Sequence, residues 1–599
     1  MPKSSRMKLS YNIPTLYRLL FLYLEPLLAI GAAIQTHFAP KIFLNTMSQT
    51  SEYAPDNQVI YDQVAALYTL FAFNEAVLLR LTNDIRVWKG VFIGIFICDI
   101  LHLVPGLSIA IVQNDQVESV GFGMASVEDD KPCTADTLFD IASSSKSLTA
   151  ASIALLVDDN ENYPEIQYDS VMSELLPDDF VMAENEYTKG ITIDDILGHR
   201  TGMPGHDESY MGEHSTQPDN ARSITRNLRN LAPAAPLRSR YLYCNMMYTV
   251  ATHLVEVKTK KTFAEFLEER LFQPLGMDSS SLQPDGVRAK GLGERLAKGH
   301  IWDKKTSLYR EIEARNCPEG QGAGSVVSSA NDLIKWIKAL INQEKPINGN
   351  VYQGLIKERS SREPKGGKLK PHTSPIKYTA GMEVYWYRGH AVYGHNGVVS
   401  GFGSRFIFLP EFKFGAVVLG NSEGTNSVAA QLFRDLIDEV VGVPREERTP
   451  LLNIQMTAKS QQGAKAKKKA QGNQSNEENK MAKKPREKKK EKGSRSTQPQ
   501  TRPLDQYTGY YWNAGYHGMN VEIKDDALFI DATDRSMAFT LTFEHERDQT
   551  RYTAHLSDFW EGGDDLISAE FIFDGDKAVK MGLDLEPLIG DKIWFERKD

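Results

Sequence analysis

Residues Phe139–Ala150 read FDIASSSKSLTA, which predicts a short strand that runs into the first turn of a helix. Ser143 lies at the turn and Lys146 follows three residues later, so both side chains share one face of the helix. A serine hydroxyl is a weak nucleophile until a neighbouring base takes its proton. A desolvated lysine one turn away can be that base, and the helix N-terminus offers backbone N–H groups to a developing oxyanion.

The S-x-x-K spacing is a catalytic signature, but it has little specificity alone. Ser5 and Lys8 match it too, in a tail where no catalytic site is expected. Two further motifs follow Ser143 in the same α/β segment, Tyr243-Cys244-Asn245 and then His395-Asn396-Gly397. Three such motifs in one order, widely separated, are much more specific than any one of them.

This ordered set resembles the serine β-lactamase and penicillin-binding-protein superfamily, nearest to class C β-lactamases and their esterase and D-aminopeptidase relatives. Four other short stretches also resemble the family: PGLSIA from Pro105, LGHRTGMP from Leu197, FQPLGM from Phe272 and GAGSVVSS from Gly322. The resemblance covers about residues 105–445. It implies an α/β (α+β) fold in which helices flank an antiparallel sheet beside an all-helical subdomain.

The resemblance also implies catalytic roles for three residues and a binding role for a fourth. Ser143 would be the acylated nucleophile, and Lys146 would be the base that activates it. Tyr243 would pass a proton toward the leaving group. Asn245 would hold Lys146 and the acyl side of the substrate.

The third motif would line the substrate cleft. His395 and Gly397 stand where the β-lactamases have Lys-Thr-Gly, and the backbone N–H groups of Ser143 and Val398 would form the oxyanion hole. With His395 in place of the family's lysine, the site lacks a permanent positive charge that would bind a substrate carboxylate. This departure favours esters, amides or D-amino-acid peptides over β-lactam antibiotics.

The motifs therefore predict a serine hydrolase that cleaves an ester or an amide or peptide bond of a small-molecule substrate through an acyl-enzyme on Ser143. A transesterase, which passes the acyl group to an alcohol, would use the same residues and stays open. A catalytically inactive ligand-binding or membrane-scaffold protein is the other alternative. The sequence does not indicate the oligomeric state.

No cofactor or metal is expected. The four cysteines are scattered and show no metal-ligand spacing or disulfide framework. Cys244 is expected to pack beside Tyr243, and His199 to be a buried hydrogen-bonding residue. Three other histidines are expected in loops, without a metal-binding role: His206, His214 and His300.

Residues 1–104 are predicted to be a helical, multi-pass transmembrane segment, which would attach the protein to a membrane. Three apolar stretches are each near the length that crosses a bilayer, Leu16–Phe38, Val64–Leu81 and Val87–Val104. A soluble helical cap is the alternative, since Arg18, Glu25 and Glu75 are costly in lipid. The segment is similar to an uncharacterised family of small fungal membrane proteins.

The side of the membrane stays open. Positive charges at the tail and after the second stretch put residues from 105 onward on the lumenal or external face. The scattered cysteines and a lysine-rich segment would suit the cytosol equally well. The third stretch also occupies the place where the family has an amphipathic helix, so the junction is unusual.

The predicted catalytic domain, residues 105–456, is followed by a linker and a second domain. Residues 457–502 carry 15 Lys and Arg against 4 Asp and Glu with almost no apolar content, which predicts a disordered linker. A nucleic-acid-binding arm is the weaker alternative, because the rest of the chain is acidic and gives no reason to expect nucleic acid. Short alternating strands in residues 503–599 predict a small antiparallel β-barrel, similar to the lipocalin-like domain of some serine peptidases. This barrel should fold separately and cover the cleft or dock a partner.

Overall fold

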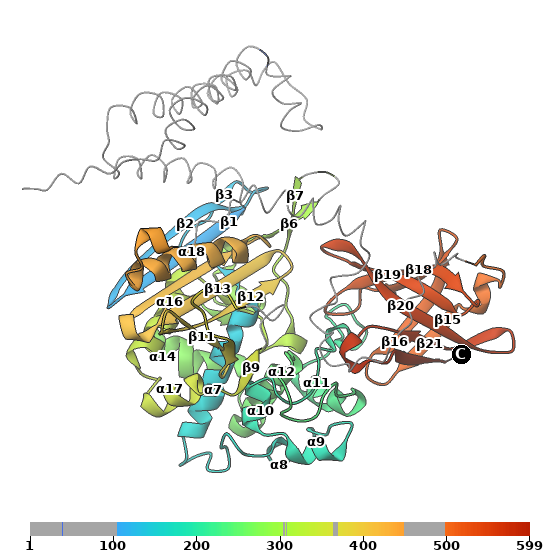
Figure 1. Cartoon of the computed structure of the whole chain (residues 1–599), viewed down its shortest axis with the longest axis horizontal. Helices are drawn as coiled ribbons and strands as arrows, with labels where there is room; N and C mark the ends of the chain where they lie inside the picture. The colour runs from blue at the N-terminus through green and yellow to red at the C-terminus, as the bar shows by residue number, and fades with distance from the viewer. Residues whose placement is uncertain are drawn as a thin grey trace, which may run out of the picture. The chain divides into compact units, whose positions relative to one another are not determined.

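Strands from the two ends of the α/β segment lie side by side in one sheet (Figure 1). In the computed structural model β1 (Gly106–Gln113) pairs antiparallel with β14 (Phe414–Gly420), with Leu107 opposite Gly420. The structure describes residues 39, 105–303, 306, 308–362, 369–448 and 498–598. Residues 105–301 and 311–598, where described, belong to one compact unit.

The main sheet has nine strands in the order β3-β2-β1-β14-β13-β12-β11-β10-β9. All its neighbouring strands run antiparallel, which confirms the predicted antiparallel sheet. The other strands are β2 (Gln116–Ser126), β3 (Lys131–Pro132), β9 (Ser360–Arg362), β10 (Ile376–Tyr378), β11 (Glu383–Tyr387), β12 (His390–Val399) and β13 (Phe402–Leu409).

Helices cover both faces of this sheet because its central strands are apolar on both sides. In β14, Val417 and Leu419 belong to one buried cluster, together with residues of α7 (Lys146–Asp158) and α16 (Ala330–Asn342). Ala416 and Val418 alternate with them and belong to the cluster of α18 (Thr425–Val440). Successive side chains of a strand point to opposite faces, so each face packs on its own helices.

Shorter elements build a helical subdomain beside the sheet and a small sheet behind the predicted nucleophile. The helices are α8 (Met172–Leu175), α9 (Asn185–Gly190), α10 (Ile193–Leu197), α11 (Ala221–Asn227), α12 (Met246–Thr259), α13 (Phe263–Leu267), α14 (Gln273–Leu275), α15 (Gln283–Ala289) and α17 (Gly349–Ile356). The small sheet joins β4 (Phe139–Asp140), β8 (Val326–Ser328) and β5 (Ser281–Leu282). Two more strands are β6 (Gly299–Asp303) and β7 (Leu308–Ile312).

The C-terminal strands close into an eight-stranded barrel, which confirms the predicted β-barrel. They are β15 (Gly509–Asn513), β16 (His517–Lys524), β17 (Ala527–Ala532), β18 (Phe539–Arg547), β19 (Arg551–Asp558), β20 (Gly562–Asp574), β21 (Lys577–Leu583) and β22 (Ile593–Arg597). Closure leaves no free strand edge. Buried rings of Tyr507, Tyr511, Phe543, Tyr552 and Phe571 pack against one another in the core of the barrel.

Two predicted segments fall wholly or mostly outside the described part of the chain. The three apolar stretches within residues 1–104 are not described, and among the residues that are, no helix is both long and apolar enough to cross a bilayer. Of the predicted linker, residues 498–502 are described. They lie against the barrel, where the Gln498 N–H donates to Glu546 O and the Thr501 N–H donates to Gln549.

Candidate active site

Ser143 lies in a single 3₁₀ turn, η4 (Ala142–Ser145), between β4 and α7. The predicted first turn of an α-helix is therefore a tighter turn, and α7 begins at Lys146. Ala142 has a φ of +45°, a left-handed conformation that is costly for a residue with a side chain. The Asp140 carboxylate accepts the Ala142 N–H at 2.7 Å and holds this turn in place. The turn leaves Ser143 half-buried.

Lys146 is fully buried, and its ammonium nitrogen has three polar neighbours. Nζ lies 2.9 Å from Ser143 Oγ, 2.9 Å from Asn245 Oδ1 and 2.7 Å from the carbonyl oxygen of Ala323. The amide and carbonyl oxygens can only accept hydrogen bonds. A neutral lysine therefore gives its two N–H groups to these oxygens, and its lone pair faces the Ser143 hydroxyl. This arrangement suits a general base.

The electrostatic surroundings favour that neutral form. Burial lowers the pKa of Lys146 to about 7, although the nearby negative charge of Asp207 works in the opposite direction. A base with a pKa close to the working pH is the most effective one, because it is available without losing its affinity for the proton.

Tyr243 completes the surroundings of Ser143. Its hydroxyl donates to Ser143 Oγ at 2.8 Å, and Lys146 Nζ lies 4.8 Å from the centre of its ring. Burial raises the pKa of Tyr243 far above its usual value, so the phenol keeps its proton. The geometry therefore favours Tyr243 as a proton donor, with Lys146 as the base.

Asp207 is a member of this network that the motifs did not indicate. The Asn245 side-chain amide donates from Nδ2 to Asp207 Oδ1 at 3.1 Å, while its Oδ1 accepts from Lys146. Asp207 begins the short 3₁₀ helix η5 (Asp207–Ser209) after the LGHRTGMP stretch at Leu197, and no spacing in the sequence links it to Asn245. Only the fold brings the two together.

The third motif lies on β12, next to the turn that carries Ser143. A Cβ on Gly397 would lie 2.3 Å from the carbonyl oxygen of Ile141 and 2.8 Å from Ser143 N, so only glycine allows this approach. The Val398 side chain is 57 % exposed. The backbones that carry the two predicted oxyanion-hole N–H groups are thus adjacent.

His395 is buried, and both its ring nitrogens have partners inside the protein. Nδ1 lies 2.7 Å from the carbonyl oxygen of Asn396 and must donate to it, and Nε2 lies 3.1 Å from the Tyr378 hydroxyl. Burial, with help from the charge of Lys146, lowers the pKa of His395 to about 3. The residue in the position of the family's lysine is therefore a neutral imidazole at neutral pH.

The sequence matches the β-lactamase family model over residues 100–439. The chain belongs to the β-lactamase family of serine hydrolases. Residues 494–597 match a domain of unknown function, DUF3471, and residues 10–118 match another, DUF7704.

Two fungal relatives share most of their length with this β-lactamase family member. The unguisins hydrolase ungD' of Aspergillus campestris is 31% identical over 503 residues, 83% of this chain and 89% of the relative. The unguisins hydrolase ungD of Aspergillus violaceofuscus is 31% identical over 523 residues, 83% of this chain and 88% of the relative. The octameric penicillin-binding protein homologue from Pyrococcus abyssi shares the fold, with a TM-score of 0.50, 19% identity and coverage of 85% of this chain and 100% of that one.

The other residues singled out in the sequence lie apart from the predicted reacting groups or support them. His199 is buried, as expected, and its Nδ1 accepts the Cys244 N–H at 3.2 Å. Burial raises the pKa of the Cys244 thiol to about 12, which fits a packing residue. His206 and His214 lie in loops, but the loop prediction for His300 is wrong, because this residue lies in β6 and contacts Glu311.

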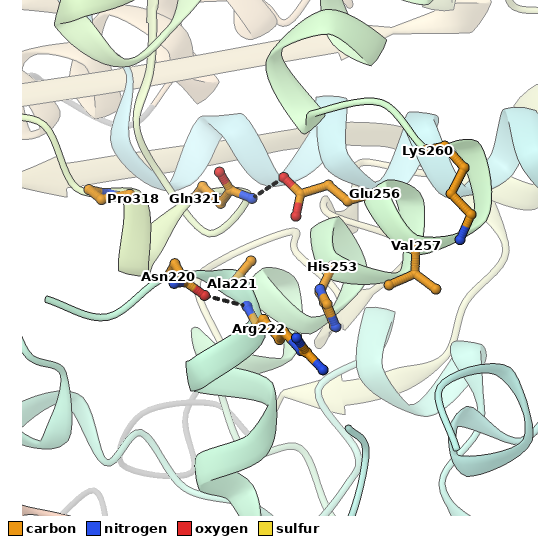
Figure 2. Close-up of a pocket in the computed structure, with 9 residues that line it drawn as sticks. All are labelled: Asn220, Ala221, Arg222, His253, Glu256, Val257, Lys260, Pro318 and Gln321. Atoms are coloured by element: carbon orange, nitrogen blue, oxygen red, sulfur yellow. Dashed lines mark hydrogen bonds between the residues drawn. The ribbon is translucent and has the colours of Figure 1, made fainter. Parts of the chain in front are cut away.

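A separate hollow of about 340 Å³ lies between α11 and α12 (Figure 2). His253 on its wall is eight residues beyond Asn245, about 12 Å along a helix. Polar side chains that line the hollow are bonded to other protein groups. Arg222 and His253 both contact Asp179, and Gln321 donates to Glu256. None of the predicted site residues lines this hollow.

Proposed function

We propose that this β-lactamase family member is an amide or peptide hydrolase that acts on a small-molecule substrate through an acyl-enzyme on Ser143. One observation carries the proposal. Lys146 is buried between Ser143 and two oxygens that can only accept, so its neutral form presents a lone pair to the Ser143 hydroxyl.

The proposed reaction uses these contacts. Lys146 Nζ takes the hydroxyl proton as Ser143 Oγ bonds to the substrate carbonyl carbon, and backbone N–H groups stabilise the resulting oxyanion. The carbon–nitrogen bond then breaks, and Tyr243 gives its phenolic proton to the departing nitrogen. The tyrosinate that remains takes a proton from the lysine ammonium, which returns both groups to their starting states. Water then attacks the acyl carbon and gives a proton to Lys146, and the bond to Ser143 Oγ breaks as Oγ takes that proton, which releases the acid and restores the serine hydroxyl.

Two facts guide the proposed choice of substrate. The relatives named above are hydrolases named for unguisins, and a D-aminopeptidase of Brucella anthropi is 24% identical over 357 residues. His395 is neutral where a lysine would grip a substrate carboxylate, so substrates without that carboxylate are favoured. We therefore expect D-amino-acid amides to be better substrates than the β-lactam nitrocefin.

The test compares the full chain with Ser143→Ala on aryl esters, D-amino-acid amides and nitrocefin, with an active-site phosphonate probe in parallel. The variant should lose turnover by about 10⁴-fold or more and lose all labelling. Ser5→Ala is the matched control, since Ser5 and Lys8 have the same spacing, and it should behave as wild type. Labelling that persists in Ser143→Ala would refute the proposal. Product analysis with added alcohol would reveal acyl transfer.

We also propose that residues 1–104 attach the enzyme to a membrane. The support is the sequence pattern of three apolar stretches of near-spanning length. The orientation that follows from their flanking charges puts the hydrolase on the lumenal or external face.

A further inference from the structure

The barrel contacts the hydrolase at the loop that carries Asp207. The Ser536 N–H donates to Tyr210 O at 3.0 Å, and the Gly212 N–H donates to Asp534 O at 2.9 Å. Arg535, between these two barrel residues, is buried and donates to Met211 Sδ. Paired backbone groups and a buried arginine define one register between the barrel and this loop.

Two barrel side chains hold His206, the residue before Asp207. The Tyr516 hydroxyl lies 2.7 Å from His206 Nδ1, and Glu586 Oε2 accepts the His206 N–H at 3.1 Å. The third partner is the carbonyl oxygen of Ala232, 2.9 Å from Nε2. A carbonyl only accepts, so the proton is on Nε2 and Tyr516 donates to Nδ1. All three side chains that meet here are buried.

His206 has a φ of +49°, in the left-handed region that a residue with a side chain adopts at a cost. Its backbone and ring are both bound by the barrel, and these contacts offset that cost. The conformation of His206 determines where the chain turns, and therefore where the Asp207 carboxylate points.

Asp207 in turn determines how the Asn245 amide is oriented. An ionised carboxylate only accepts, so Nδ2 of Asn245 faces Asp207 and Oδ1 faces Lys146. If the Asn245 amide rotated by half a turn, its Nδ2 donor would face Lys146 Nζ. Two donors would then point at each other with no acceptor between them. The base would then lose one of the two acceptors that direct its lone pair to Ser143.

We propose that the C-terminal barrel is a positioning element of the catalytic centre: Tyr516 and Glu586 hold His206, so that Asp207 orients Asn245 toward Lys146. The inference rests on the proposed function, in which Lys146 is the base. Tyr516, Glu586 and Asp207 are positioning residues, because they act on the reacting atoms through others.

The charge of Asp207 makes this role measurable. It raises the pKa of Lys146 against the stronger effect of burial, so its loss or displacement should lower that pKa further. The groups that face Lys146 or interact with its charge are Asp207, Cys244, His199, His395, Tyr243 and Tyr248. Of these, Asp207 is the carboxylate, so a shift toward lower pH reports on Asp207.

The experiment measures kcat/KM against pH in the full chain. Asp207→Asn should lower kcat/KM about 10- to 100-fold and move the acidic limb of the profile to lower pH. Tyr516→Phe should lower kcat/KM about 3- to 10-fold and move the limb in the same direction. Glu586→Ala should resemble Tyr516→Phe, and Glu586→Gln, which keeps an acceptor, should restore most of the rate.

Tyr511→Phe is the matched control. Tyr511 is also a buried barrel tyrosine, but its hydroxyl donates to Tyr507 O within the barrel. This variant should lose barrel stability without any change in the acidic limb. The double variant Tyr516→Phe with Asp207→Asn should be no slower than Asp207→Asn alone, because both act through one chain of contacts.

Three outcomes would overturn the inference. The first is a wild-type profile of kcat/KM against pH in both Tyr516→Phe and Glu586→Ala. The second is an acidic limb that does not move in Asp207→Asn. The third is a double variant whose loss of kcat/KM equals the product of the two single losses. If Tyr516→Phe fails to fold, the two Glu586 variants decide. Loss of Ser143-dependent probe labelling in the wild type would refute the proposed function itself. Normal labelling with unchanged variants would refute the positioning role alone.

Discussion

At the scale of single residues, the donor and acceptor capacities around Lys146 are more informative than its identity. A lysine with three acceptor neighbours would be satisfied only as an ammonium, but one of these neighbours is the Ser143 hydroxyl, which can also donate. The site can therefore hold either protonation state with every hydrogen bond made. Proton exchange between this lysine and its serine would need no rearrangement.

The first prediction is the pH dependence of the reaction. In the proposed mechanism the reactive form of Lys146 is neutral, and its pKa is lowered to about 7, so this form becomes the majority as the pH rises through 7. We expect kcat/KM to increase tenfold per pH unit below 7 and to level off above it.

Lys146→Arg supplies the control for that profile. Arginine keeps the positive charge but stays protonated throughout the accessible range, so activity should be lost by about 10³-fold or more at every pH. A wild-type profile that is flat from pH 5 to 9 would contradict the assignment of Lys146 as the base.

At the scale of elements, the site depends on how closely β12 approaches the turn between β4 and α7. Ser404 Oγ donates to Ile141 O at 2.6 Å and lies 2.8 Å from Ser144 Oγ, so β13 also anchors this turn. The Asn426 amide, on α18, donates to Gly397 O at 2.7 Å. The spacing between strand and turn is therefore set from both sides of the sheet.

The second prediction concerns this spacing. Gly397→Ala would place a Cβ against two backbone atoms, and a backbone cannot move aside as a flexible side chain can. We expect about 100-fold lower kcat/KM and a loss of about 2 kcal/mol in the free energy of unfolding. Steady-state kinetics and urea denaturation measure the two effects.

Gly349→Ala is the matched control at the start of α17, where the nearest atom to a new Cβ is 3.6 Å away at the end of the Gln343 side chain. It should leave activity unchanged and stabilise the helix slightly. An active, stable Gly397→Ala enzyme would show that the approach of β12 is not required.

At the scale of the whole molecule, the catalytic part and the barrel are joined through residues 457–502, whose composition predicts disorder. The third prediction is that trypsin cleaves first between Lys465 and Lys492, because an unfolded lysine-rich segment fits a protease site without prior unfolding. Mass spectrometry of the early fragments identifies the sites. First cleavage within residues 105–448 would contradict the predicted linker.

The fourth prediction concerns the membrane. If the flanking charges orient residues 1–104 as the positive-inside rule requires, the hydrolase lies inside sealed microsomes and is protected from added protease. Asn473, in the sequence Asn-Gln-Ser, would then be available for glycosylation. Digestion of the hydrolase without detergent would show the opposite orientation. Recovery of the full chain in a soluble fraction would exclude the membrane segment.

Much of the fold and the identity of the site residues could be read from the sequence. The strands around Leu107 and Ala416 are continuous apolar runs, because both of their faces are buried. The barrel strands alternate apolar and polar residues, because only one of their faces is buried. The motifs at Ser143, Tyr243 and His395 were found because their chemistry needs those residue types at short spacings. The structure brings these three segments together, and the roles of their residues stay predictions.

The tertiary structure decided what no short spacing records. Asp207 and Asn245 are 38 positions apart, and His206 and Tyr516 are 310 apart, so no local pattern connects them. The low pKa of Lys146 arises from complete burial, which depends on every element packed around α7. The sequence by itself determined the family motifs and, through them, which groups are predicted to react. The fold decided how each is held and in which protonation state, because hydrogen-bond partners and desolvation exist only once distant segments have packed together.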